Sequence, residues 1–430
     1  MGVSLMNALR KISKVYLILI SVFLIIMSLV YSIPNRRIKW HVEESVQQLE
    51  IEGVYPSVFF NTIAARLDNY TDSIMLNIAA HADNNRPIRS SMKNPYRLAK
   101  ESGENLRVDD LKTAIKDKDN SEETTYSRYW HGYLGILRPL LVFFNYTEIR
   151  FLNICALFML FLVVNILLKK ELGLGIMISF FFSMMMSMFI IIPMSLQFSS
   201  MFYVMLIGMI FILLRYRYIY NKKLDTCLFF IIGGVTSFLD FLTAPLITLG
   251  FPLVTYMFIT QDNNKTFIIN TRDIIKNCFS WGVGYIAIWI SKWIFGSLIT
   301  GENLFLEAVG RVAMRTSSEM GEGEYFNILS VLKNNFDMVF NNTSIYIFML
   351  LVICYVILAI LFSKSIKEIS KVLPVLCIGI IPIIWYCLTL NHSGIHFWFT
   401  YRNLSIGIFS MLAFLSYSID IKRIKLKYTL

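Results

Sequence analysis

The sequence predicts an all-α polytopic membrane protein with about ten transmembrane helices, cytoplasmic N- and C-termini, and a long exterior loop bearing interfacial helices after the first span. Three observations predict this class: the composition, the apolar runs, and the placement of lysine and arginine. Hydrophobic residues make up 56% of the 430 residues and charged residues 16%, and the mean hydropathy is +0.58. Soluble domains contain about 45–50% apolar and about 25% charged residues. This composition excludes a disordered chain and a secreted scaffold held by disulfides.

The apolar runs supply the predicted spans. A helix needs roughly 17–25 residues to cross the hydrocarbon core. The first run is not a cleaved signal peptide, because it is too long and no small-residue cleavage site follows it before Pro34. The predicted spans are 15–33, 150–168, 174–194, 201–216, 226–243, 245–260, 278–299, 343–363, 371–391 and 403–420.

The basic residues predict the orientation. Lysine and arginine concentrate on cytoplasmic loops of membrane proteins. The last short outer loop carries only Arg402. The net charge of +11 is therefore a consequence of sidedness, and no nucleic-acid partner is expected. The basic segments, all on the predicted inner side, are 1–14, 169–173, 214–225, 261–277, 364–371 and 420–430.

Two long segments fall on the predicted exterior side, 34–149 and 300–342. They divide the chain into 1–33 (N-terminus and first span), 34–149 (first exterior loop), 150–299 (spans two to seven), 300–342 (second exterior loop) and 343–430 (spans eight to ten and a basic tail). Within the first loop, 82–125 is polar and is expected to be a surface excursion. All six cysteines lie in or at the ends of spans, so no disulfide framework is indicated, which fits a bacterial plasma membrane.

Two carboxylates stand four residues apart in the first exterior loop. Asp68 and Asp72 share a face if this stretch is helical. Such a pair can hold a divalent cation such as Mg²⁺ or Mn²⁺, or supply a general base. The alternative is a solvated helix face with a polar cap.

A basic and aromatic cluster follows before a short apolar run over 133–144, which predicts an interfacial helix. Arginine forks bind phosphate in a bidentate manner and aromatic rings stack on sugars. The alternative is an aromatic belt with arginines that reach lipid headgroups. The candidate substrate contacts here are Arg128, Trp130, His131 and Arg138.

Further candidates lie near the predicted outer ends of later spans. Asp240 is an ionisable group at membrane depth and thus a candidate catalytic residue. In the last outer loop, His392, His396 and Arg402 are candidate phosphate or sugar contacts. Gly394 argues against a helix that would present the two histidines as a metal pair. Glycines among acidic residues in the second exterior loop indicate a flexible segment that covers a site.

This plan resembles the GT-C superfamily of integral-membrane glycosyltransferases, in which a carboxylate-bearing exterior loop follows the first span and a later loop covers the site. The resemblance implies transfer of a sugar from a polyprenyl-phosphate donor to a glycan, lipid or protein acceptor on the exterior face. It implies that Asp68 or Asp72 acts as base or metal ligand, and that Arg128, Arg138 and Arg402 contact phosphate. The Trp-Trp-Asp signature of oligosaccharyltransferases is absent, which leaves the acceptor open.

Two alternatives remain open. A polysaccharide polymerase or ligase that uses polyprenyl diphosphate would depend on arginine and histidine in outer loops and need no metal. A transporter or lipid flippase would need a polar path through spans whose clear charges are only Asp240 and Lys292. The chain carries no Walker loop and no nucleotide-binding fold signature, so work driven by cytosolic ATP is not expected.

Overall fold

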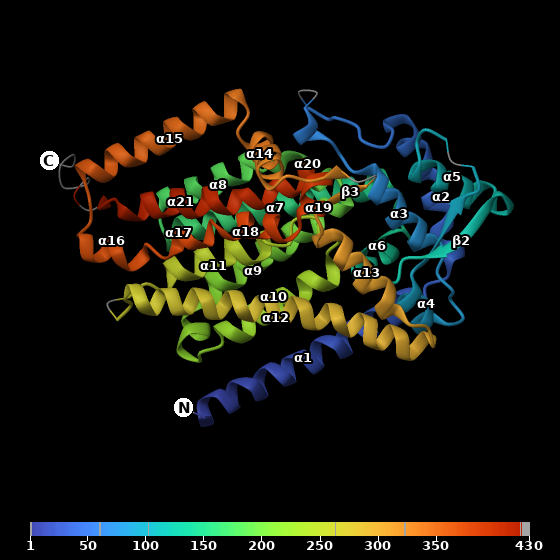
Figure 1. Ribbon diagram of the computed structural model, residues 1–430, viewed down its shortest axis with the longest axis horizontal. Helices are drawn as coiled ribbons and strands as arrows, with labels where there is room; N and C mark the ends of the chain where they lie inside the picture. Colours follow the sequence, from blue (N-terminus) through green and yellow to red (C-terminus); the bar gives the residue numbers. More distant parts are fainter. Residues whose placement is uncertain are drawn as a thin grey trace.

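The computed structural model describes residues 2–59, 62–101, 103–262, 264–321, 324–421 and 423. Within them the fold is helical, with two small two-stranded sheets. Figure 1 shows the long helices side by side along the longest axis of the molecule. In that view α1 (Gly2–Tyr31) begins and α21 (Ser405–Ser418) ends at one end of the bundle, and the segment from α2 (Asn35–Glu52) to α6 (Leu134–Leu140) occupies the other.

Six helical stretches among the described residues are long and apolar enough to cross a membrane. They are apolar on most of their circumference, as expected for helices that face lipid and neighbouring helices. The helical class is confirmed and the apolar helices fit a membrane-embedded protein, while ten crossings and cytoplasmic termini stay predictions. The six are Leu9–Tyr31 of α1, α7 (Tyr146–Glu171), α9 (Leu196–Asn221), α12 (Phe267–Thr300), Thr343–Leu361 of α15 (Asn342–Leu361), and Ile366–Leu388.

The other predicted spans are shorter or broken helices, and one of the six stretches is itself divided. Ile366–Leu388 divides into α16 (Ile366–Val372), α17 (Val375–Ile378) and α18 (Ile381–Leu388). After α8 (Leu174–Met186), Met188 adopts a left-handed conformation and a 3-10 helix, η3 (Phe189–Met194), follows. The shorter apolar helices are α8 (Leu174–Met186), α10 (Asp225–Leu239) and α11 (Ile247–Ile259).

Two glycines allow the closest helix packing in the bundle. A Cβ atom at Gly233 of α10 would collide with the backbone of Trp281 in α12, and one at Gly284 would collide with the backbone of Phe230. In a bilayer no hydrophobic effect drives helices together, so they associate through close packing, which small residues permit. The α10–α12 contact therefore depends on these two positions.

The described residues of the polar stretch 82–125 form short helices and two paired strands, with many exposed positions. Strands β1 (Pro95–Ala99) and β2 (Ser121–Thr125) pair antiparallel, with Pro95 opposite Thr125. Between them α5 (Arg107–Lys116) buries Val108 and Leu111. Asn77 of the preceding helix α3 (Asn69–Ala80) fixes this unit in place, because its side chain exchanges hydrogen bonds with the backbone of Arg97. The elements of the segment are α2, η1 (Ile63–Ala65), α3 (Asn69–Ala80), α4 (Pro87–Lys93), β1, α5 (Arg107–Lys116), η2 (Lys118–Asn120), β2 and α6.

The second segment that is predicted to be exterior, 300–342, is also structured over its described residues. Helix α13 (Leu304–Thr316) is followed by β3 (Glu319–Gly321), β4 (Glu324–Tyr325) and α14 (Ile328–Val339).

Near the C-terminus, α19 (Leu390–Ile395), α20 (Phe397–Thr400) and η4 (Tyr401–Leu404) lead into α21. Gly394 lies inside α19, contrary to the expectation that it prevents a helix. The ring of Phe326 occupies the space that a Cβ atom would need. The glycine therefore serves packing at this position.

Candidate functional site

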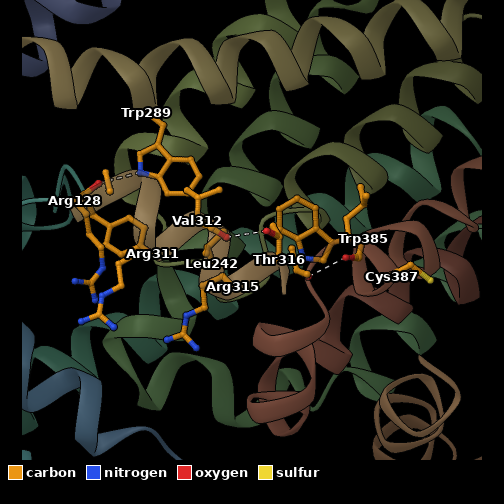
Figure 2. A pocket seen from close by; sticks show the side chains of 13 residues that line it. Arg128, Leu242, Trp289, Arg311, Val312, Arg315, Thr316, Trp385 and Cys387 are labelled. Carbon is orange, nitrogen blue, oxygen red and sulfur yellow. Dashed lines mark hydrogen bonds between the residues drawn. The ribbon is translucent and has the colours of Figure 1, made fainter. Parts of the chain in front are cut away.

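Three arginines border one cavity of about 490 Å³, the arginine cavity. Arg128 precedes α6, while Arg311 and Arg315 lie four residues apart on α13 and so share a helix face. Figure 2 shows their guanidinium groups pointing to the same side, away from the end formed by Trp385 and Cys387.

Arg128 is held in place by several contacts. Its Nη1 atom donates to Glu307 on α13 at 3.2 Å, and its guanidinium lies 4.1 Å from the ring centroid of Tyr126. Its carbonyl oxygen accepts hydrogen bonds from the indoles of Trp289 and Trp293 at 3.0 and 3.1 Å. These contacts fix one wall of the cavity.

Arg311 and Arg315 form no ion pair with any carboxylate in the part of the chain that the structure describes. Arg311 is exposed and Arg315 is half-buried. The Nη1 atom of Arg315 lies 3.4 Å from the amide oxygen of Asn391. Two positive charges beside the cavity thus lack an anionic partner.

The loop after α10 forms the floor of the cavity through Leu242, which has a left-handed backbone with φ of 65°. Asp240 stabilises this loop: one carboxylate oxygen accepts from the backbone N–H of Thr243 at 2.9 Å and the other from the hydroxyl of Tyr285 at 3.1 Å. Asp240 is buried and does not line the cavity. Its contacts assign it to positioning the loop.

Asp68 caps the N-terminus of α3. Its carboxylate accepts from the backbone N–H of Thr71 at 3.0 Å and from the Thr71 hydroxyl at 2.9 Å. Burial raises the pKa of Asp68 to about 7, although the Thr71 hydrogen bonds and the charge of Arg402 act to lower it. A carboxyl group with such a pKa can take up and release a proton near neutral pH.

Asp72 has a different environment, although it lies one turn away. Its two oxygens accept from the backbone N–H groups of Leu196 and Gln197 at 2.9 and 3.0 Å, from Tyr146 at 2.6 Å and from Ser195 at 3.2 Å. The carboxylate therefore caps the positive end of α9. A carboxylate has about four lone-pair directions, so four donors leave Asp72 no ligand position for a cation.

The predicted cation site therefore does not fit the donors present at this pair. Among the described residues no three His, Cys, Asp or Glu side chains gather as a metal site.

Arg402 is fully buried near Asp68. Its guanidinium lies 4.2 Å from the ring centroid of Phe198, and Nη1 lies 3.4 Å from the Phe399 carbonyl. Its Nε and Nη2 atoms have no hydrogen-bond partner in the described part of the chain, nor do the side-chain amide atoms of Asn403. A buried charge with open donors is costly unless an anion meets it.

The surroundings of His392 and His396 favour the neutral form of both imidazoles. Burial lowers the pKa of His392 to about 3 and that of His396 well below its ordinary value, with the charge of Arg315 contributing. His392 donates from Nε2 to the Leu242 carbonyl at 2.7 Å, and His396 stacks on Phe399 with centroids 5.0 Å apart. Both histidines therefore stabilise the region around the cavity through contacts that uncharged imidazoles make.

Two predicted substrate contacts, Trp130 and His131, do not line the cavity. The indole of Trp130 donates to the Ile288 carbonyl at 2.7 Å. His131 contacts the Tyr126 carbonyl and the Tyr133 hydroxyl at 2.8 and 3.1 Å. The prediction for these residues is corrected to a structural role.

Arg138 is likewise corrected from phosphate contact to structural clamp. Its guanidinium donates to the carbonyls of Val30 at 2.7 Å, Ile33 at 2.6 Å and Ala79. These oxygens come from the end of α1, the segment after it and α3. This buried arginine therefore ties α1 and the residues after it to α3.

The arginine cavity and the Asp68–Arg402 pair are connected through the loop that contains Leu242 and Thr243. Leu242 lines the cavity, and its carbonyl accepts a hydrogen bond from His392. The hydroxyl of Thr243 accepts from Gln197 at 3.1 Å, and Gln197 is adjacent to Phe198, which Arg402 contacts. The sequence reasoning did not select Arg311, Arg315, Gln197 or Asn403. Only the two arginines had a usable signal, their spacing of four in an amphipathic stretch.

An apolar groove of about 680 Å³ runs between α6, α7, α9 and α10. Leu140, Leu152, Ile207 and Phe211 are among its lining residues, and Met75 of α3 borders it. Helix α3, whose N-terminus Asp68 caps, therefore also contacts this groove.

Comparison with known protein families, with curated proteins and with solved structures gave no match. The fold is that of a helical protein whose apolar helices fit a membrane environment, with one cavity bordered by three arginines. The resemblance to GT-C glycosyltransferases stays a prediction.

Proposed function

We propose that this protein transfers a sugar from a polyprenyl-phosphate donor to an acceptor on the exterior face of a bacterial plasma membrane. One observation carries the proposal: Asp68, with a pKa of about 7, lies buried near Arg402, whose Nε and Nη2 atoms are open. A proton acceptor beside an unfilled anion-binding group is what glycosyl transfer from a phosphate requires.

The chemistry assigns one role to each residue. Asp68 accepts the proton of the acceptor hydroxyl as its oxygen attacks the anomeric carbon. The bond between that carbon and the phosphate oxygen breaks, and its electron pair leaves with the polyprenyl phosphate. Arg402 stabilises the negative charge on the departing phosphate. Asp68 then releases its proton to water, and no step is routed through a cation.

The apolar groove supports a lipid-linked donor. An isoprenoid chain is a long hydrocarbon, and burying it in such a groove is favourable. Because Met75 belongs to the same helix as Asp72, the groove and the carboxylate lie on one structural unit.

The three arginines favour a second candidate, a polysaccharide polymerase or ligase that uses a polyprenyl diphosphate. A diphosphate carries more charge than a monophosphate, and arginine forks suit it. Comparison of the mono- and diphosphate donors in one assay separates the two candidates.

The test is sugar transfer in membranes that contain the protein, with a labelled polyprenyl-phosphate sugar and a surface-glycan extract. We expect Asp68→Asn to lose transfer while the exposed Asp119→Asn retains it. Full activity of Asp68→Asn would overturn the proposal.

A further inference from the structure

The arginine cavity is separate from the Asp68–Arg402 pair, since neither of those residues lines it. The phosphate that leaves in the proposed reaction is bound by Arg402, so it does not explain the three arginines that border the cavity. We propose that the arginine cavity binds the acceptor, and that this acceptor is an anionic glycan with carboxylate or phosphate groups. The inference rests on the proposed function and names its acceptor class.

The charges of the cavity suit such a ligand. Glu307 neutralises Arg128, which leaves Arg311 and Arg315 as two cations one helical turn apart. A guanidinium binds a carboxylate or a phosphate through two parallel N–H bonds. Two such groups on one helix face can engage successive anionic sugars of a chain.

The aromatic walls suit sugar rings. Tyr129 and Trp289 stand nearly parallel, with ring centroids 5.9 Å apart, and both line the cavity. Trp385 also lines it, and its indole N–H has no acceptor among the described residues. A flat ring surface beside an open donor matches a sugar, which has an apolar face and peripheral hydroxyls.

The exposure of the arginines indicates how the ligand enters. Arg311 is exposed, Arg315 is half-buried and Arg402 is fully buried. An exposed guanidinium at the rim is hydrated and attracts anions from solution, whereas an isoprenoid chain enters from lipid. The volume lies in the range of about 300–1,000 Å³ that is typical of small-ligand sites, so the cavity holds the end of a glycan chain.

The probes are oligosaccharides of matched length that differ only in charge. An oligogalacturonate, its methyl ester and an oligomer of glycerol phosphate are titrated into the purified full chain in nanodiscs, with tryptophan fluorescence as the signal. We expect the acid to bind at least about tenfold more tightly than the neutral ester, as two charge-assisted contacts imply. The phosphate oligomer shows whether carboxylate or phosphate is preferred.

Arg311→Gln is the first variant, because an exposed and unpaired side chain is not needed for folding. It should remove most of the preference for the acid, and Arg311→Gln with Arg315→Gln should remove all of it. The matched control is Lys333→Gln, an exposed cation on α14 outside the cavity. Equal binding of acid and ester, or unchanged binding by the double variant, would overturn the inference.

Two further measurements separate the possible failures. Vesicles with anionic lipid that compete with the glycan would assign the cavity to lipid headgroups and contradict the inference. Release of sugar from the donor to water, without acceptor, reports on the Asp68–Arg402 pair alone. That release should persist in the double arginine variant and be lost in Asp68→Asn, so failure of the acceptor site is distinguished from failure of the proposed function.

Discussion

The positive charge of Arg402 acts on the carboxyl group of Asp68, and both residues are buried without forming an ion pair with each other. Arg402 lowers the pKa of Asp68 against the larger effect of burial.

Sugar transfer should depend on pH through Asp68. Because its pKa is about 7 and the base must be ionised, activity should rise as the pH rises through about 7. For folding the sign is opposite: the native state holds this proton more tightly than the unfolded chain, so the contribution of Asp68 to stability decreases between about pH 4 and about pH 7. The measurements are a pH–rate profile and thermal unfolding at several pH values. A flat rate profile between pH 5 and 8 would contradict the assignment.

Asp72→Ala should destabilise the protein. Removal of the carboxylate leaves the N–H groups of Leu196 and Gln197 and the hydroxyl of Tyr146 without their acceptor. The expected loss is on the order of 3 kcal/mol, from hydrogen bonds to a charged group. Thermal unfolding in detergent measures it, with Asp119→Ala as the exposed control. An unfolding temperature equal to that of the wild type would contradict the capping role.

Arg138→Met should impair folding, because it leaves the carbonyls of Val30, Ile33 and Ala79 unsatisfied. We expect a stability loss on the order of 3 kcal/mol and unchanged donor affinity for each folded molecule. The exposed Arg37→Met is the control. Normal folding with weakened donor binding would restore the earlier expectation of a phosphate contact.

His392→Gln should preserve activity better than His392→Leu. Glutamine can still donate to the Leu242 carbonyl, whereas leucine cannot. With a pKa of about 3, His392 stays neutral across the working range, so neither variant should move the pH–rate profile. A shifted profile in His392→Gln would show that this histidine titrates in the reaction.

Chelation of divalent cations should leave sugar transfer intact. The four donors to Asp72 occupy its carboxylate, so the pair with Asp68 cannot act as a two-carboxylate site. Transfer is measured before and after EDTA treatment. Loss of activity that returns with Mg²⁺ or Mn²⁺ would show that the cation expected from the sequence is required.

The long apolar helices were predictable because each stretch carries its own signal, the length of an apolar run. The paired strands β1 and β2 were not, since their partners are separated by α5 and the stretch between them is polar. The sequence indicated that Asp68 and Asp72 share a helix face. It could not show that Asp72 meets the start of α9, which is distant in the chain.

The sequence also could not show which arginines contact distant segments of the chain. Arg128 and Arg138 look alike in the sequence, each beside aromatic or apolar residues. The structure separates them through their acceptors: Arg138 binds backbone carbonyls of distant segments, while Arg128 pairs with Glu307 of α13 at a cavity. Contacts of this kind depend on tertiary packing and have no local pattern.

The most direct test of the central proposal is transfer of a labelled sugar from its polyprenyl phosphate by wild-type protein, Asp68→Asn, Arg402→Gln and the double variant. We expect loss of the base to lower the rate by about 10²–10⁴-fold. The double variant should be less impaired than the product of the two single effects, because both groups act on one transition state. Wild-type rates in Asp68→Asn, in protein shown to be folded, would contradict it.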